Sequence, residues 1–155
     1  MPLNSDLREF LRLLNTNGVE YAIVGAFAVG FHGFPRATGD LDVWVRPTPQ
    51  NAKRVMRALA EFGFGNVGLT SEDFERPHRT VQLGYPPYRV DLLTGITGVD
   101  TEQIWSSRTA GELEGVSVQY IGRNELLQNK EATARPKDLI DANEVRRRHT
   151  RQVKK

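Results

Sequence analysis

The first half of the chain alternates between helix-like and strand-like spacing of its hydrophobic residues. Residues 21–24 are a short apolar run that predicts a buried strand, and Gly25 then opens a second apolar helix that continues to about residue 31. The β-branched run over residues 40–45 predicts another strand. A helix is predicted before the first strand, because after Ser5 apolar residues recur every three or four positions: Leu7, Phe10, Leu11 and Leu14.

The second half continues as a mixture of helices and strands. Thr48-Pro49 has the composition of a helix start, and Gly63 ends that helix. The stretch 66–78 indicates a strand and a short turn of helix. The remaining expected elements are strands at 80–83 and 88–93, a helix at 100–105, a hairpin at 112–118, and helices at 124–132 and 136–147. This order predicts a mixed α/β (α+β) domain.

Composition favours one globular domain. The chain has 155 residues, of which 39% are hydrophobic and 26% charged, and it has no cysteine for a disulfide or a thiolate metal site. No apolar run approaches the roughly 18 residues of a membrane span, and the N-terminus lacks the pattern of a signal peptide. We therefore expect a cytoplasmic protein with no membrane contact.

Charge is unevenly distributed. Residues 146–155 hold six of the 21 basic residues and no acid, which leaves 15 basic against 19 acidic residues in the rest of the chain. We therefore divide the chain into a single domain over 1–145 and a basic tail over 146–155. The tail either contacts a nucleic acid or acidic partner, or is a solvated helix end whose cations suit the helix dipole.

The candidate chemistry lies on the strand predicted at 40–45. Asp40 and Asp42 are two residues apart, so on a strand they point to the same face. Asp91 is an isolated acid inside another apolar strand, and an unpaired buried carboxylate is costly. If the two strands are neighbours, the three acids form a cluster that suits Mg²⁺ or Mn²⁺, and two such ions support phosphoryl or nucleotidyl transfer. The alternative is that Asp40 caps a turn, Asp42 lies on the surface and Asp91 pairs with an arginine.

Gly25 supports the first interpretation. A strand followed by glycine and a helix start brings backbone N–H groups to one point, which favours phosphate binding. Together, Val24-Gly25-Ala26, Asp40-Leu41-Asp42-Val43 and Val90-Asp91-Leu92 resemble the DNA polymerase β-type nucleotidyltransferase superfamily. The resemblance covers roughly residues 18–145 and is strongest to small prokaryotic branches, the abortive-infection-type and minimal nucleotidyltransferases, and more distantly the lincosamide nucleotidyltransferases.

The resemblance implies a nucleotidyltransferase fold with a mixed, mostly antiparallel sheet and helices packed on it. It implies that Asp40, Asp42 and Asp91 bind Mg²⁺ or Mn²⁺ and are the catalytic residues. Gly25 and the N–H of Ala26 would hold the β- and γ-phosphates of an NTP. The sequence departs from the family pattern at Ala26, where Gly or Ser is usual and a serine hydroxyl often helps to bind phosphate.

Three further residues are candidates for nucleotide binding. Arg36 could hold a triphosphate or could pair with a carboxylate. Thr38 could donate its hydroxyl or could simply favour a strand. Lys137 could reach a phosphate, as a Lys-Asp pair in the resembling group suggests, or could form a surface pair with Asp141 four residues later.

The function expected from these residues is metal-dependent transfer of NMP from an NTP such as ATP to a hydroxyl, with release of pyrophosphate. The acceptor is a protein, a tRNA or a small molecule. The alternative is a catalytically weak or inactive binding or regulatory protein with the same fold, such as a toxin–antitoxin component. A two-metal phosphohydrolase is disfavoured because the sequence lacks a histidine-rich ligand set.

Overall fold

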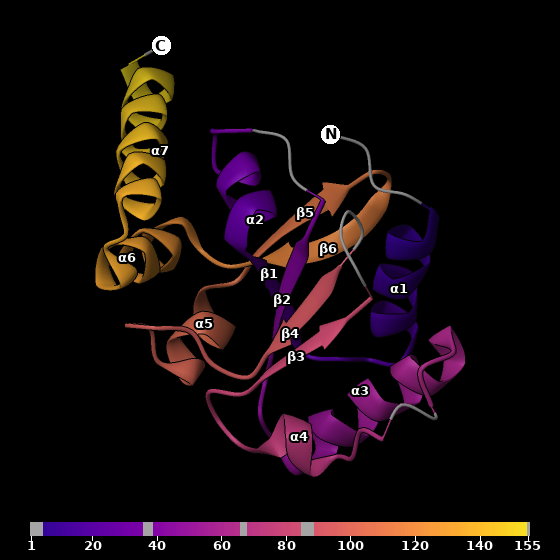
Figure 1. The fold of residues 1–155 in the computed structure, drawn as a ribbon. Coiled ribbons are helices and arrows are strands. Elements are labelled where there is room, and N and C mark those ends of the chain that lie inside the picture. Colours follow the sequence, from indigo (N-terminus) through magenta and orange to yellow (C-terminus); the bar gives the residue numbers. More distant parts are fainter. Residues whose placement is uncertain (1–4, 36–38, 66–67, 85–88, 155) are drawn as a thin grey trace.

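The computed structural model describes residues 5–35, 39–65, 68–84 and 89–154, with side chains up to residue 148. Its helices are α1 (Ser5–Thr16), α2 (Gly25–Phe31), α3 (Pro49–Phe62), α4 (Glu72–Glu75), α5 (Thr101–Ser107), α6 (Arg123–Thr133) and α7 (Pro136–Lys154). Its strands are β1 (Tyr21–Val24), β2 (Leu41–Val45), β3 (Thr80–Leu83), β4 (Val90–Leu93), β5 (Thr109–Leu113) and β6 (Val116–Tyr120). Figure 1 shows these elements along the chain.

The strands form one six-stranded sheet in the order β3-β4-β2-β1-β6-β5. The pairs β1–β2, β3–β4 and β5–β6 are antiparallel, whereas β2–β4 and β1–β6 are parallel. A mixed, mostly antiparallel sheet with helices packed on it was predicted, and this prediction is confirmed. The parallel pairs join strands that are distant in sequence, so they bring β4 beside β2 at the centre of the sheet.

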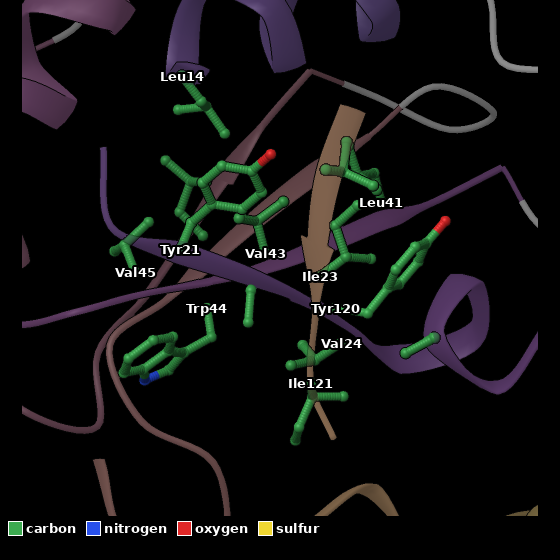
Figure 2. Packing of buried hydrophobic residues seen from close by; sticks show 14 of the residues in the cluster. Leu14, Tyr21, Ile23, Val24, Leu41, Val43, Trp44, Val45, Tyr120 and Ile121 are labelled. Atoms are coloured by element: carbon green, nitrogen blue, oxygen red, sulfur yellow. The ribbon is translucent and has the colours of Figure 1, made fainter. Parts of the chain in front are cut away.

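Helices cover both faces of the sheet: α1 and α3 lie on one side, and α5, α6 and α7 on the other (Figure 1). The two faces differ because side chains alternate along each strand. Figure 2 shows Tyr21, Ile23 and Val43 packed beneath Leu14 of α1, while Trp44 points to the opposite side. Leu14, Ile23, Val43 and Trp44 are fully buried. The face of β2 that carries Trp44 is also the face that carries Asp42.

Local sequence signals explain where α3 begins and ends. The Thr48 side chain accepts a hydrogen bond from the backbone N–H of Asn51, and Pro49 occupies the first helical position. Gly63 ends the helix with a φ of 104°, a conformation that favours glycine. The predicted start and end of this helix are therefore confirmed.

Two predicted boundaries differ from the structure. In the described part of 66–78 there is no strand, and the segment contains only the short helix α4 around the buried Phe74. The last helix, predicted to end near residue 147, continues to Lys154, so the basic tail is an extension of α7. Among the described residues, no helix is long and apolar enough to span a membrane.

Candidate active site

Two carboxylates meet at the centre of the sheet. In the parallel pairing of β2 and β4, Asp42 lies directly opposite Asp91. Asp40 stands one residue before β2, and its charge influences the ionisation of Asp42. The expectation that the strand carrying Asp91 lies beside 40–45 is thus confirmed. Asp42 and Asp91 are distant in sequence, but they lie side by side on the neighbouring strands β2 and β4.

Arg89 bridges two of the acids. Its Nη2 lies 3.3 Å from Oδ2 of Asp40 and donates a hydrogen bond of 3.2 Å to Oδ2 of Asp91. Its Nε lies 3.0 Å from Oδ1 of Asp91. The pairing of Asp91 with an arginine, one of the sequence alternatives, is therefore present. It coexists with the carboxylate cluster, because the guanidinium partly neutralises the acids that the fold brings together.

Asp42 shows the electrostatic cost of this arrangement. Burial, and then the negative charges of Asp91 and Asp40, raise the pKa of the Asp42 carboxyl to about 6, against the opposing influence of Arg89 and Lys130. A carboxyl whose neighbours disfavour its charge is stabilised in the ionised form by an added cation. Asp42 therefore has the environment expected of a metal ligand.

Gly25 fits against this carboxylate. It has a φ of 68°, and a Cβ atom on it would overlap Oδ2 of Asp42. Both facts explain why glycine stands at the junction of β1 and α2. Val24 pairs with Asp42 across β1 and β2, so the strand-to-helix turn lies on one side of Asp42 and Asp91 lies on the other.

These residues open onto a cleft of about 420 Å³. Its floor comes from the sheet, and its walls come from α6 and from the segments that precede β3 and follow β4. Its lining includes Gly25, Asp42, His78, Asp91, Gly95 and Lys130. A concave site with convergent polar groups and a perturbed carboxyl is a candidate active site.

Lys130 is a cleft residue that the sequence did not single out. Only 8% of it is exposed, and its Nζ lies 3.4 Å from Oδ1 of Asp138 and 3.3 Å from Oδ2 of Asp141. Both acids are on α7 and are almost completely buried. A buried lysine persists as a cation only with such partners. The ion pairs thus join α6 to α7 and place a positive charge in the cleft.

Asp138 is held by hydrogen bonds as well as by its ion pair with Lys130. Burial acts to raise its pKa, but hydrogen bonds from Arg135 and Thr133 and the charge of Lys130 outweigh burial and lower the pKa to about 2. The hydrogen bond from Arg135 Nε is 2.7 Å, and that from Thr133 Oγ1 is 2.8 Å. The acid therefore stays ionised at neutral pH and orients the polar end of α6.

The donor chemistry of Asp40, Asp42 and Asp91 fits a hard divalent cation, and burial followed by the charges of Asp91 and Asp40 raises the pKa of Asp42. In the arrangement described, no group of three or more His, Cys, Asp or Glu side chains among the placed residues is spaced to hold a metal ion. Arg89 lies between two of the acids, in contact with both Asp40 and Asp91.

The other sequence candidates have different outcomes. Arg36 and Thr38 lie outside the described residues. Lys137 is exposed and is not among the residues that line the cleft.

The expected surface pair of Lys137 with Asp141 is wrong, because Asp141 is buried and pairs with Lys130. Asp141 lies on the inner face of α7. Its carboxylate therefore points toward α6 and not along the exposed surface of its own helix.

The basic extension of α7 is partly occupied by contacts within the chain. Arg146 pairs with Glu131 of α6 and Arg147 with Glu144. Arg148 donates a hydrogen bond of 3.2 Å to the carbonyl oxygen of Gly33. Arg146 and Arg148 therefore help to dock α7 on the rest of the chain, whereas the pair of Arg147 with Glu144 lies within the helix. These contacts favour the structural interpretation for this half of the tail.

Comparison with known proteins supports the fold assignment. No protein-family model matches the chain, and neither does any curated protein sequence. Solved structures do match. An antigenic nucleotidyltransferase-like protein from Paracoccidioides brasiliensis is 18% identical, with a TM-score of 0.56 over 94% of this chain and 78% of that one.

Two antibiotic-modifying enzymes are similar to the same extent. A lincosamide antibiotic adenylyltransferase with lincomycin bound is 12% identical, with a TM-score of 0.56 over 94% of this chain and 97% of that one. The enzyme ANT(2'')-Ia, in complex with adenylyl-2''-tobramycin, is 12% identical, with a TM-score of 0.55 over 90% and 84%. The chain has the nucleotidyltransferase fold, which confirms at the level of the fold the resemblance found in its sequence.

Proposed function

We propose that the protein is a metal-dependent nucleotidyltransferase that moves NMP from an NTP to a hydroxyl group and releases pyrophosphate. The observation that carries the proposal is the juxtaposition of Asp42 and Asp91 on neighbouring strands, beside the turn at Gly25. The nucleotidyltransferase fold of the solved relatives supports it.

Different residues would bind the metal ions and the phosphates. Asp40, Asp42 and Asp91 would hold Mg²⁺ or Mn²⁺, and two such ions stabilise the charge on the attacking and leaving oxygens of an in-line displacement. Gly25 and the N–H of Ala26 would contact the β- and γ-phosphates. Asp91 lies on the side of Asp42 away from Gly25, so the acceptor hydroxyl would approach from there.

Lys130 would contribute a positive charge to the nucleotide site. Its Nζ is fixed by Asp138 and Asp141, and its charge reaches Asp42. A cation held in place on the wall of a cleft can bind a phosphate oxygen without ordering a flexible side chain. Lys130 is therefore better placed for this role than the exposed Lys137, whereas Arg36 and Thr38 remain sequence predictions for the same nucleotide.

The acceptor would be a protein side chain, a tRNA end or a small alcohol. The solved relatives include an enzyme holding lincomycin and another holding adenylyl-2''-tobramycin. Those ligands belong to those proteins, and this chain differs from them at more than four positions in five. The basic tail favours a macromolecule, although Arg146, Arg147 and Arg148 already have partners within the chain.

The test is to incubate the protein with Mg²⁺, each of the four NTPs labelled at the α-phosphorus, and a lysate of the source cell. Label should be transferred to one class of molecule by the wild type and not by Asp42→Asn. Asp100 is exposed and is not among the residues that line the cleft, so it supplies the control Asp100→Asn, which should label normally. Equal labelling by Asp42→Asn and the wild type would contradict the proposal.

A second candidate function is a binding or regulatory protein that keeps the fold without turnover, such as a toxin–antitoxin component. The contacts of Arg89 with Asp40 and Asp91 favour it, because they occupy two of the three acids. Ala26, which lacks a phosphate-binding hydroxyl, favours it as well. This candidate predicts that a partner protein co-purifies and that no NTP yields pyrophosphate.

A further inference from the structure

His78 has an unusual backbone conformation at one end of the cleft. Its φ is 58°, one of three positive values among the described residues other than glycine. Positive φ is uncommon in residues other than glycine, although histidine adopts it more often than most, and unusual backbone conformations cluster at functional sites. His78 lines the cleft, is exposed, and makes no hydrogen bond or ion pair with another described residue.

Thr94 holds the loop that contains His78. The threonine is 1% exposed, and its Oγ1 accepts a hydrogen bond of 2.8 Å from the N–H of Arg79 and donates one of 2.6 Å to the carbonyl oxygen of Arg76. Its own N–H donates a hydrogen bond of 2.9 Å to the carbonyl oxygen of Arg79. The loop is thus fixed on both sides of His78 by one buried side chain at the end of β4.

Gly95 lets the imidazole ring lie against the sheet. A Cβ atom on Gly95 would come 2.7 Å from Nδ1 and 3.1 Å from Cε1 of His78, so the ring packs where a side chain would otherwise stand. The ring is therefore a fixed aromatic wall. The cleft beside it is lined by the apolar side chains of Leu93 and Ile96.

The position of this wall relative to the carboxylates limits what it can contact. Gly25, Asp42 and Asp91 follow one another across the sheet, from β1 to β2 to β4. In the proposed reaction the leaving pyrophosphate lies toward Gly25 and the acceptor hydroxyl toward Asp91. In-line displacement then places the attacking oxygen, the α-phosphorus and the leaving oxygen on one axis that runs across the strands. The nucleoside on the α-phosphorus must then extend away from that axis.

The cleft extends away from that axis along β4. Gly95 follows Asp91 by four residues, the last two of them beyond the end of β4, so the two Cα atoms are at most about 14 Å apart. A ribose and a base extend over a comparable distance from an α-phosphate held at the carboxylates. Resting on the function proposed above, we propose that His78 contacts the base of the bound NTP, with the imidazole stacked on it at the Gly95 end of the cleft.

The test compares two kinds of probe, nucleoside triphosphates and a triphosphate that has no nucleoside. Binding of each of the four NTPs and of inorganic tripolyphosphate, all with Mg²⁺, is measured by calorimetry for wild type and His78→Asn. Asparagine tolerates positive φ and removes the aromatic ring. We expect NTP binding to weaken about tenfold, the size of a lost stacking contact, while tripolyphosphate binding is unchanged. Gly95→Ala, which displaces the ring, should produce the same selective loss.

The matched control is Glu114→Asn, since Glu114 also has a positive φ of 50° but lies in the turn between β5 and β6, at the far edge of the sheet. It should leave both probes unchanged. Equal weakening of NTP and tripolyphosphate by His78→Asn would mean that the ring contacts phosphate, and would overturn the inference. Unchanged binding of both probes would overturn it too. A wild-type protein that binds neither probe would overturn the proposed function, and the inference with it.

Discussion

The Cα atom of Gly25 lies against the carboxylate of Asp42, so closely that a Cβ atom at this position would overlap Oδ2. This contact ties the turn between β1 and α2 to the centre of the site. The glycine in the sequence pattern is therefore required twice, for its positive φ and for the space that it leaves to the acid.

Gly25→Ala should strain the backbone and also displace the Asp42 carboxylate. The same substitution at another glycine with positive φ should only strain the backbone. Gly18 has a φ of 67° and nothing within 4 Å of a Cβ atom, so Gly18→Ala isolates the backbone strain. We expect Gly18→Ala to cost about 1 kcal/mol of unfolding free energy and Gly25→Ala about 3 kcal/mol, because only the second adds steric overlap. Urea denaturation measures both, and equal losses would contradict the contact.

Asp42 gives the metal-free protein a specific pH dependence. Its pKa rises from 3.8 to about 6 on folding, so between these values the native state holds a proton that the unfolded state has lost. Stability should therefore fall as the pH rises through this window, and the cost is complete above pH 6. In EDTA, Asp42→Asn should stabilise the protein at pH 8 by about 1 to 2 kcal/mol and have little effect at pH 4.

Thermal unfolding at the two pH values checks this expectation, with the exposed Asp100→Asn as a control that should shift neither. Destabilisation by Asp42→Asn at pH 8 would show that the carboxylate is not under electrostatic strain.

Lys130 forms ion pairs with two buried acids, so removing its charge should lower the free energy of unfolding substantially. Lys130→Met leaves Asp138 and Asp141 without their shared cation, and we expect a loss of about 3 kcal/mol at pH 7. Adding Asp141→Asn should restore part of that loss, because it removes one uncompensated charge. The exposed Lys137→Met is the matched control on the neighbouring helix and should change the stability by less than about 0.5 kcal/mol. Denaturant titration of the four proteins gives the comparison.

Arg89 and a divalent cation should compete for the same acids. Arg89→Gln removes the guanidinium that contacts Asp40 and Asp91 and makes the site more negative. Both effects should tighten Mn²⁺ binding, by about fivefold if the lost pairs behave as partly exposed ion pairs. Calorimetry with Mn²⁺ measures the change, and weaker binding by the variant would show that Arg89 supports the metal site.

Much of the site could be predicted from the sequence because its elements are marked by local patterns. Alternation placed Asp42 on a strand, and the single acid in Val90-Asp91-Leu92 identified the second strand. Their contact depends on the parallel pairing of β2 and β4, which joins segments almost fifty residues apart. The sequence supported this pairing only because an isolated buried acid requires a partner.

Lys130 and His78 could not be predicted in the same way. Lys130 stands in a polar stretch of α6, and its burial results from the packing of α7 against that helix. His78 follows the turn residue Pro77, but the loop that holds it against the cleft depends on hydrogen bonds with Thr94, sixteen residues later. Both depend on tertiary contacts between segments whose own sequences carry no motif.

Nucleotidyl transfer is tested most directly by measuring where the α- and γ-phosphorus atoms of one NTP go. Wild-type protein and Asp91→Asn are incubated with Mg²⁺, the lysate, and NTP labelled at either the α- or the γ-phosphorus. Nucleotidyl transfer predicts that wild type moves the α-label to an acceptor and releases the γ-label as pyrophosphate in equal amount, and that Asp91→Asn does neither. Transfer of the γ-label, or its release as inorganic phosphate, would contradict the account.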